Sequence, residues 1–191
     1  MLKRLSVTAA MLGAATAPAF AHLNPAEHGS LMAGATHPLF GADHILAMVA
    51  VGLWAATLGG RAVWTVPAAF VGTMLVGFAL AMTGAALPFV EPAILASVVA
   101  LGLLVAMAVR LPVAVSAAVV GVFALFHGFA HGGELGGAGA GSFALGFALA
   151  TIALHAAGIA LGQGLGARGG SILPRILGGA TALAGLTLMV G

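Results

Sequence analysis

Six long apolar stretches, separated by short breaks that contain glycine, proline or charged residues, dominate the 191-residue chain. A helix needs about 20 apolar residues to cross the ~30 Å hydrocarbon layer of a bilayer, and each stretch is long enough. Only 5% of the residues are charged, whereas a soluble domain usually carries about 25%. We therefore predict an all-α, polytopic membrane helix bundle with six transmembrane helices. They are expected over roughly residues 30–58, 63–83, 90–109, 112–132, 142–166 and 172–190.

The N-terminus has the pattern of a cleavable secretory signal peptide. Lys3 and Arg4 precede a short apolar run, and Ala19-Phe20-Ala21 forms an A-x-A cleavage site. We predict cleavage after Ala21, so that residues 1–21 are removed and residues 22–191 form a single transmembrane helical domain. Cleavage also removes two of the six basic residues behind the formal charge of +2. The remaining basic residues are scattered, which excludes a nucleic-acid-binding surface.

The charges between the stretches predict how the bundle lies in the membrane. With the mature N-terminus outside, the five connections alternate between the inner and the outer side. The four remaining basic residues then all fall on inner connections, as the positive-inside rule requires: Arg61, Arg110, Arg168 and Arg175. We therefore expect a multi-pass protein of a bacterial inner (cell) membrane with a periplasmic N-terminus.

The first stretch contains an unusual group of ionisable residues, His37, Asp43 and His44. Ionisable side chains inside a membrane are costly, so they suggest function. On a continuous helix, the seven-residue spacing would place both histidines on one face, about 10 Å apart along the axis. Asp43 would then line a neighbouring wall or orient an imidazole. Pro38 leaves the carbonyl of Gly34 without its helical donor, a feature of discontinuous helices that bind ions.

The fourth stretch ends with a second group, His127, His131 and Glu134. The i, i+4 spacing places both imidazoles on one helix face, with the glutamate one turn further along. Two such histidines with a carboxylate form a recognised metal-ligand arrangement. Gly128 and Gly132 leave room for another helix. The glutamate lies outside the histidine pair, so the H-E-x-x-H motif of zinc hydrolases is absent.

Two further histidines, His155 in the fifth stretch and His22 at the mature N-terminus, are candidate ligands. A helix–helix hydrogen bond is the alternative for His155, and accidental placement is the alternative for His22. From the helix lengths we expect a ladder, with His131 near the outer mouth and His44 and His155 in a deeper layer. Imidazole with carboxylate favours Ni, Co, Zn, Cu(II) or Fe over Mg and Ca.

The two groups resemble the signatures of the HupE/UreJ family of nickel and cobalt permeases. The matching residues are His37-x5-Asp43-His44 and Phe126-His127-Gly128-x-Ala130-His131-Gly132-x-Glu134, and the general layout covers nearly the whole chain. The resemblance implies a secondary importer of Ni²⁺, or of Co²⁺, that supplies hydrogenase or urease assembly. It also implies six functional positions: His37, Asp43, His44, His127, His131 and Glu134.

These observations together predict a metal-ion permease rather than an enzyme. We expect no permanently bound cofactor, only a transported Ni²⁺, Co²⁺ or Zn²⁺ ion, with the lipid bilayer as the other partner and no nucleic acid. A homo-oligomer is left open. Two other functions also remain open, a membrane metal sensor or accessory subunit without transport and an intramembrane zinc-dependent enzyme. Because ligand imidazoles must be neutral, metal binding should weaken below about pH 6.5.

Overall fold

The computed structural model describes residues 30–132, 139–169 and 172–190, and every regular element in these ranges is a helix. The predicted all-α class is therefore confirmed for this part of the chain. The predicted signal peptide, His22 and Glu134 lie outside the described residues. In chain order, the helices are α2 (Leu31–Phe40), α3 (Ala42–Leu58), α4 (Ala62–Met82), α5 (Val90–Ala106), α6 (Val113–Gly132), α7 (Ala140–Gly169) and α8 (Ile172–Val190).

Four helices, α4, α6, α7 and α8, are long and apolar enough to cross a membrane. The α2 and α3 helices pass the same test as a pair, with a bend of 84° at their junction. The α5 helix is apolar but has only 17 residues. The described helices thus provide four spans, or five if the bent pair counts as one, and a sixth span stays a prediction.

The outer surface of the bundle is apolar, whereas polar side chains lie inside. Large side chains such as Trp64, Val122 and Leu183 are more than half exposed. In contrast, His127 and Ser97 are fully buried. Exposed apolar surface on this scale is unfavourable in water and is typical of a protein surrounded by lipid. The helices therefore indicate a membrane protein.

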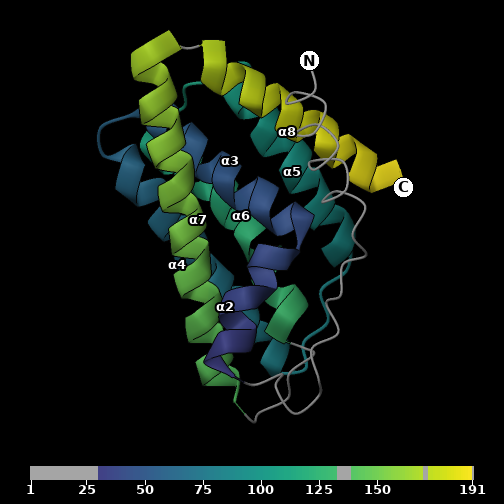
Figure 1. The fold of residues 1–191 in the computed structure, drawn as a ribbon. Helices are drawn as coiled ribbons and strands as arrows, with labels where there is room; N and C mark the ends of the chain where they lie inside the picture. Colours follow the sequence, from purple (N-terminus) through teal and green to yellow (C-terminus); the bar gives the residue numbers. More distant parts are fainter. Residues whose placement is uncertain (1–29, 133–138, 170–171, 191) are drawn as a thin grey trace, which may run out of the picture.

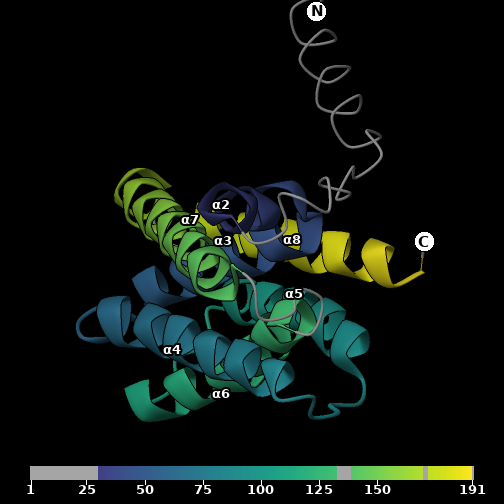
Figure 2. The same ribbon diagram turned by 90° about the horizontal axis from the view of Figure 1, so that it is seen from below.

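The helices pack in pairs, as Figure 1 shows. The α4 helix lies along α6, α5 lies along α8, and both α2 and α3 pack on α7. In the turned view of Figure 2, α2, α3 and α7 lie on one side of the bundle, and α4 and α6 lie on the other. Side chains from α2 and α3 can therefore meet side chains from α6 in the interior between these two sides.

Glycines allow several of these helices to approach closely. A Cβ atom at Gly128 would overlap the carbonyl of Met74 on α4, and one at Gly132 would overlap the carbonyl of Phe78. The prediction that these two glycines make room for another helix is confirmed. Gly158 on α7 meets the backbone of α3 in the same way, which is the small-residue packing common between membrane helices.

The first apolar stretch is not the continuous helix predicted over residues 30–58. The α2 helix continues through Pro38 and ends at Phe40, and Gly41 then adopts an extended backbone before α3 begins. A Cβ atom at Gly41 would lie 2.9 Å from Oδ1 of Asp43 and 3.0 Å from Nδ1 of His44. Glycine fits this break because the side chains of Asp43 and His44 lie back against it.

The arginine-rich and histidine-rich ends of the bundle lie opposite each other. Arg110, just before α6, and Arg175, at the start of α8, line one shallow depression. His131 lies in the last turn of the same α6 helix, at its other end. The arginines and the histidines thus lie at opposite ends of the bundle. This fits the predicted topology, in which the arginines lie on the inner side of the membrane.

Candidate metal centre

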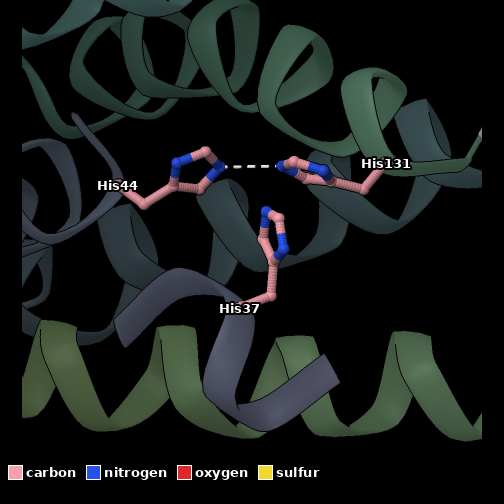
Figure 3. Close-up of side chains that lie close together, drawn as sticks. All are labelled: His37, His44 and His131. Carbon is pink, nitrogen blue, oxygen red and sulfur yellow. Dashed lines mark hydrogen bonds between the residues drawn. The ribbon is translucent and has the colours of Figure 1, made fainter. Parts of the chain in front are cut away.

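Three histidines from three helices point toward one another inside the bundle, as Figure 3 shows: His37 on α2, His44 on α3 and His131 on α6. One ring nitrogen of each lies within 4.8 Å of the others. The Nε2 atoms of His44 and His131 are 2.8 Å apart. His44 and His131 are buried, and His37 is partly exposed. Imidazole nitrogens that converge in this way can bind a transition-metal ion.

The bend at Gly41 brings His37 and His44 together. The continuous helix of the prediction would separate them by about 10 Å along its axis. That prediction is wrong, because the ring centroids are 5.6 Å apart with the rings at 89° to each other. The 84° turn between α2 and α3 lets the two imidazoles approach one point from different directions.

The predicted ladder of histidines is also wrong in one respect. It placed His131 in an outer layer and His44 in a deeper one, but the two imidazoles are in direct contact. The reason is again the break at Gly41, because the prediction counted residues along an unbroken helix to estimate depth. His155 lies outside the three-histidine group, and its predicted depth in the membrane stays a prediction.

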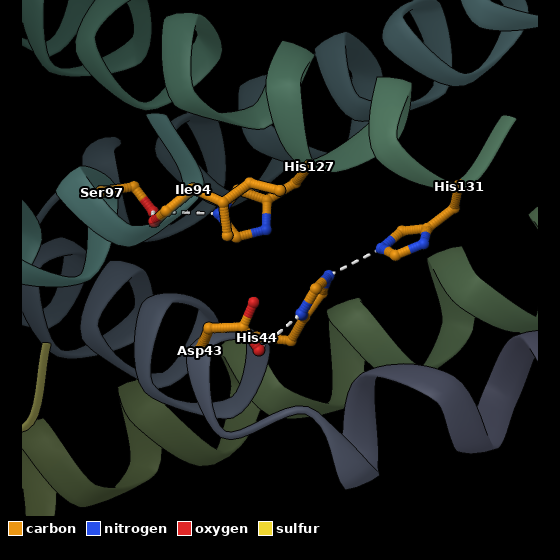
Figure 4. A network of polar contacts seen from close by, with 6 residues as sticks. All are labelled: Asp43, His44, Ile94, Ser97, His127 and His131. Atoms are coloured by element: carbon orange, nitrogen blue, oxygen red, sulfur yellow. Dashed lines mark hydrogen bonds and ion pairs between the residues drawn. The ribbon is translucent and has the colours of Figure 1, made fainter. Parts of the chain in front are cut away.

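Asp43 contacts the imidazole of His44 on the side away from His131, as Figure 4 shows. Its Oδ1 atom lies 3.0 Å from Nδ1 of His44, in a charge contact that lacks the alignment of a hydrogen bond. A carboxylate accepts hydrogen bonds and does not donate them. Asp43 therefore favours the tautomer of His44 that carries its hydrogen on Nδ1. The lone pair of His44 is then on Nε2, which faces the centre. Two roles were considered for Asp43, lining a neighbouring wall and orienting an imidazole. This geometry matches the second.

His127 lies beside the three-histidine group and is oriented by Ser97 (Figure 4). Its ring centroid is 5.0 Å from that of His44. The Ser97 hydroxyl donates its hydrogen to the carbonyl of Ile94 at 2.6 Å, so it can only accept from Nε2 of His127, 2.9 Å away. A neutral His127 therefore carries its lone pair on Nδ1, which is buried and has no hydrogen-bond partner. That nitrogen is free to bind a metal ion.

An aromatic side chain covers the group on the α7 side. The ring centroid of Phe147 lies 5.2 Å from His131, 6.1 Å from His44 and 6.2 Å from His37. Phe147 is fully buried. An apolar wall of this kind limits the access of water and strengthens electrostatic interactions at the site.

The sequence reasoning did not identify Ser97 or Phe147. Ser97 carries the only hydroxyl group in the apolar sequence of α5, and a lone hydroxyl in the middle of such a helix is a signal that could have been used. Phe147 has no such signal, because α7 contains two phenylalanines and only tertiary packing distinguishes them.

Most of the described candidate residues lie close together in the structure, and His155 lies outside this cluster. His37, His44 and His131 form the group itself, with Asp43 and His127 in contact with His44. His155 lies elsewhere on α7. Glu134 and His22 are outside the described residues.

The spacing of the nitrogens requires only a small change to accept an ion. Two nitrogens bound to one metal ion at 2.0–2.1 Å lie about 3.0–3.4 Å apart. The 2.8 Å separation of the two Nε2 atoms is that of a hydrogen bond between neutral imidazoles, in which one donates and one accepts. To bind an ion, His131 would take the tautomer with its hydrogen on Nδ1, which has no hydrogen-bond partner among the described residues, so that the Nε2 lone pairs of both imidazoles could face the metal.

Comparison with known proteins agrees with this picture. The family model described as "HupE / UreJ protein" matches residues 9–188. Protein HupE of Rhizobium leguminosarum bv. viciae is 48% identical over 182 residues, which cover 94% of this chain and 95% of that protein. No solved structure matches the chain. The extent of the family match and the identity to this relative show that the chain belongs to the HupE/UreJ family.

Proposed function

We propose that this protein is a secondary permease that imports a divalent transition-metal ion, Ni²⁺ or Co²⁺, across the bacterial inner membrane for metalloenzyme maturation. The observation that carries the proposal is the convergence of three imidazole nitrogens within 4.8 Å, from three helices of an apolar bundle. Membership of a family associated with nickel and cobalt uptake for hydrogenase and urease supports it.

The exposure of the three histidines suggests an order of capture. His37 is partly exposed, whereas His44 and His131 are buried. A hydrated ion would meet His37 first and then exchange its water ligands for the two buried imidazoles. Asp43 would hold His44 with its Nε2 lone pair toward the ion, and His127 would offer a further nitrogen.

The charges at the two ends of the bundle support import as the direction of transport. The histidine group lies toward the end of α6 that is remote from Arg110 and Arg175. Under the positive-inside rule the arginine end faces the cytoplasm. The three histidines would then receive ions from the periplasmic side.

The membrane potential is sufficient to drive import. The sequence has no Walker loop or dinucleotide fingerprint. Two charges that cross 100 mV gain about 4.6 kcal/mol, which supports a concentration ratio of about 10³. An ATPase partner is therefore not required.

Uptake of nickel by cells that express the protein tests the proposal. His37→Ala and His131→Ala should each reduce uptake to the level of cells without the protein. Ser116→Ala is the matched control, because Ser116 is also buried on α6 but its hydroxyl contacts only the backbone carbonyl of Leu111. Wild-type uptake by both histidine variants would refute the proposed route, and metal binding without uptake would favour a sensor.

A further inference from the structure

His155 is a buried imidazole for which the three-histidine group provides no role. Its side chain is 1% exposed, and neither of its ring nitrogens has a hydrogen-bond partner among the described residues. A neutral imidazole carries one donor and one acceptor, and burial of both without partners is unfavourable. The helix–helix hydrogen bond considered from the sequence is therefore absent within the described part of the chain, and another reason for a histidine at this position is needed.

His155 lies on the same face of α7 as the residues next to the three-histidine group. Phe147, Thr151 and His155 follow one another at four-residue intervals, and all three are buried. Phe147 contacts the imidazoles of His44 and His131. Eight residues of helix correspond to about 12 Å, so His155 lies about two turns further into the bundle along a shared inward face.

The opposite wall at this depth is formed by α4. The ring centroid of Phe70 lies 5.1 Å from His155 and 5.7 Å from His127. The phenyl ring of Phe70 therefore contacts both imidazoles. The ring of His127, whose Nδ1 has no hydrogen-bond partner, also lies next to His44 of the three-histidine group. His127 thus connects the three-histidine group with the region of His155.

The other heteroatoms near this level are soft or neutral. Met74, one turn from Phe70 on α4, accepts a hydrogen bond from the Thr151 hydroxyl to its Sδ atom at 3.6 Å. An imidazole, a thioether and a hydroxyl suit a borderline transition-metal ion and provide no carboxylate for Mg²⁺ or Ca²⁺.

The α3 and α7 helices approach each other closely next to His155. A Cβ atom at Gly52 would overlap the carbonyl of His155, and one at Gly158 would overlap the carbonyl of Val49. The α3 and α7 backbones are therefore in contact immediately past this side chain.

From this arrangement we propose that His155 is a second, weaker station for the metal ion, reached from the three-histidine group through His127. The inference rests on the proposed transport function and adds an internal site to it. One imidazole with a thioether nearby holds an ion less firmly than three convergent imidazoles. Conduction needs such a site, because an ion must bind well enough to enter and weakly enough to leave.

Flux measurements on purified full-length protein test the role of His155. His155→Phe fills the same space without a ligand atom, and His155→Met restores a soft donor. We expect His155→Phe to keep metal affinity at the three-histidine group but to lower Ni²⁺ flux into proteoliposomes about tenfold or more. His155→Met should recover part of the flux. Leu154→Ala, a half-buried neighbour without a heteroatom, is the control for packing on α7.

A titration of the wild-type protein keeps the test decisive if His155→Phe does not fold. In protein with ¹⁵N-labelled histidine, Zn²⁺ beyond the first equivalent should shift the ring resonances of His155. Unshifted His155 resonances, or wild-type flux in His155→Phe, would overturn the inference. Failure of the proposed function is distinguishable, because the wild-type protein itself would then show no flux, whether or not it binds the first equivalent.

Discussion

His44 and His131 are 87 positions apart in the chain, and their Nε2 atoms are 2.8 Å apart in the fold. This pair joins the bent α2–α3 segment to the end of α6. If the pair binds the ion, His44→Ala and His131→Ala should each weaken Ni²⁺ binding strongly. Loss of a residue that only orients a ligand typically costs about 10–100-fold in affinity, and loss of a ligand itself should cost more. The double variant should bind little more weakly than either single variant, because the ligands act as a unit. Isothermal titration of the purified proteins measures this, and additive losses would argue against a shared ion.

Asp43 should influence metal affinity without being needed for folding. Asp43→Asn keeps the size of the side chain but replaces the acceptor beside Nδ1 of His44 with a group that can also donate. We expect Ni²⁺ affinity to fall about 10–100-fold, with a thermal unfolding midpoint close to that of the wild type. Unchanged affinity would show that the 3.0 Å contact does not orient the imidazole.

Ser97 should act through the tautomer of His127. Among the described residues, Ser97 is the hydrogen-bond partner of Nε2, and Ser97→Ala removes it, so His127 can exchange between tautomers and the lone pair leaves Nδ1 for part of the time. Ring ¹⁵N shifts of His127 should change from those of a single tautomer to averaged values, and metal affinity should fall. Ser97→Thr should preserve both properties. Ser116→Ala is the control, because it removes a buried hydroxyl remote from the histidines; an unaltered His127 spectrum in Ser97→Ala would contradict the assignment.

Gly41 should be sensitive to the smallest side chain. A Cβ atom there would lie within about 3 Å of both Asp43 and His44, so Gly41→Ala must displace one of them. We expect strongly reduced metal binding and uptake. Gly72→Ala is the matched control, because a Cβ atom at Gly72 on α4 meets nothing within 4 Å. Equal binding by both variants would show that the break tolerates a side chain.

Gly128 should instead affect the stability of the bundle. A Cβ atom there would overlap the carbonyl of Met74, which cannot move without shifting α4. Overpacking of this kind lowers the free energy of unfolding by about 1–3 kcal/mol. Gly121→Ala on the same helix has ordinary contact with Thr73 at 3.4 Å and should unfold like the wild type. Thermal unfolding in detergent compares the two variants. Equal unfolding midpoints would contradict the prediction.

The helix positions were largely predictable because the signals are local. Stretches expected over 63–83, 112–132 and 172–190 are helices over Ala62–Met82, Val113–Gly132 and Ile172–Val190. Apolar length sets the extent of each helix, and the glycine, proline and arginine breaks set its ends. The sequence likewise identified His37, His44 and His131, because ionisable residues are rare in apolar stretches.

The geometry between these residues was not predictable in the same way. Beside the break at Gly41, α2 packs closely against α7, where a Cβ atom at Gly34 would overlap the carbonyl of Phe143. No pattern within residues 30–58 encodes that contact. Because the break at Gly41 was not predicted, the depth assigned to His44 was wrong. In the unbroken α6 helix, the spacing correctly predicted that His127 and His131 lie on one face.

Competitive uptake of Ni²⁺, Co²⁺ and Zn²⁺ into proteoliposomes, at a set potential and pH gradient, tests the central claim most directly. We predict that an inside-negative potential drives accumulation of Ni²⁺ or Co²⁺ through the wild-type protein. The same measurement on His44→Ala should show no flux above that of protein-free vesicles. Flux through His44→Ala equal to that of the wild type, or no flux through wild-type protein that binds the ion, would contradict the account.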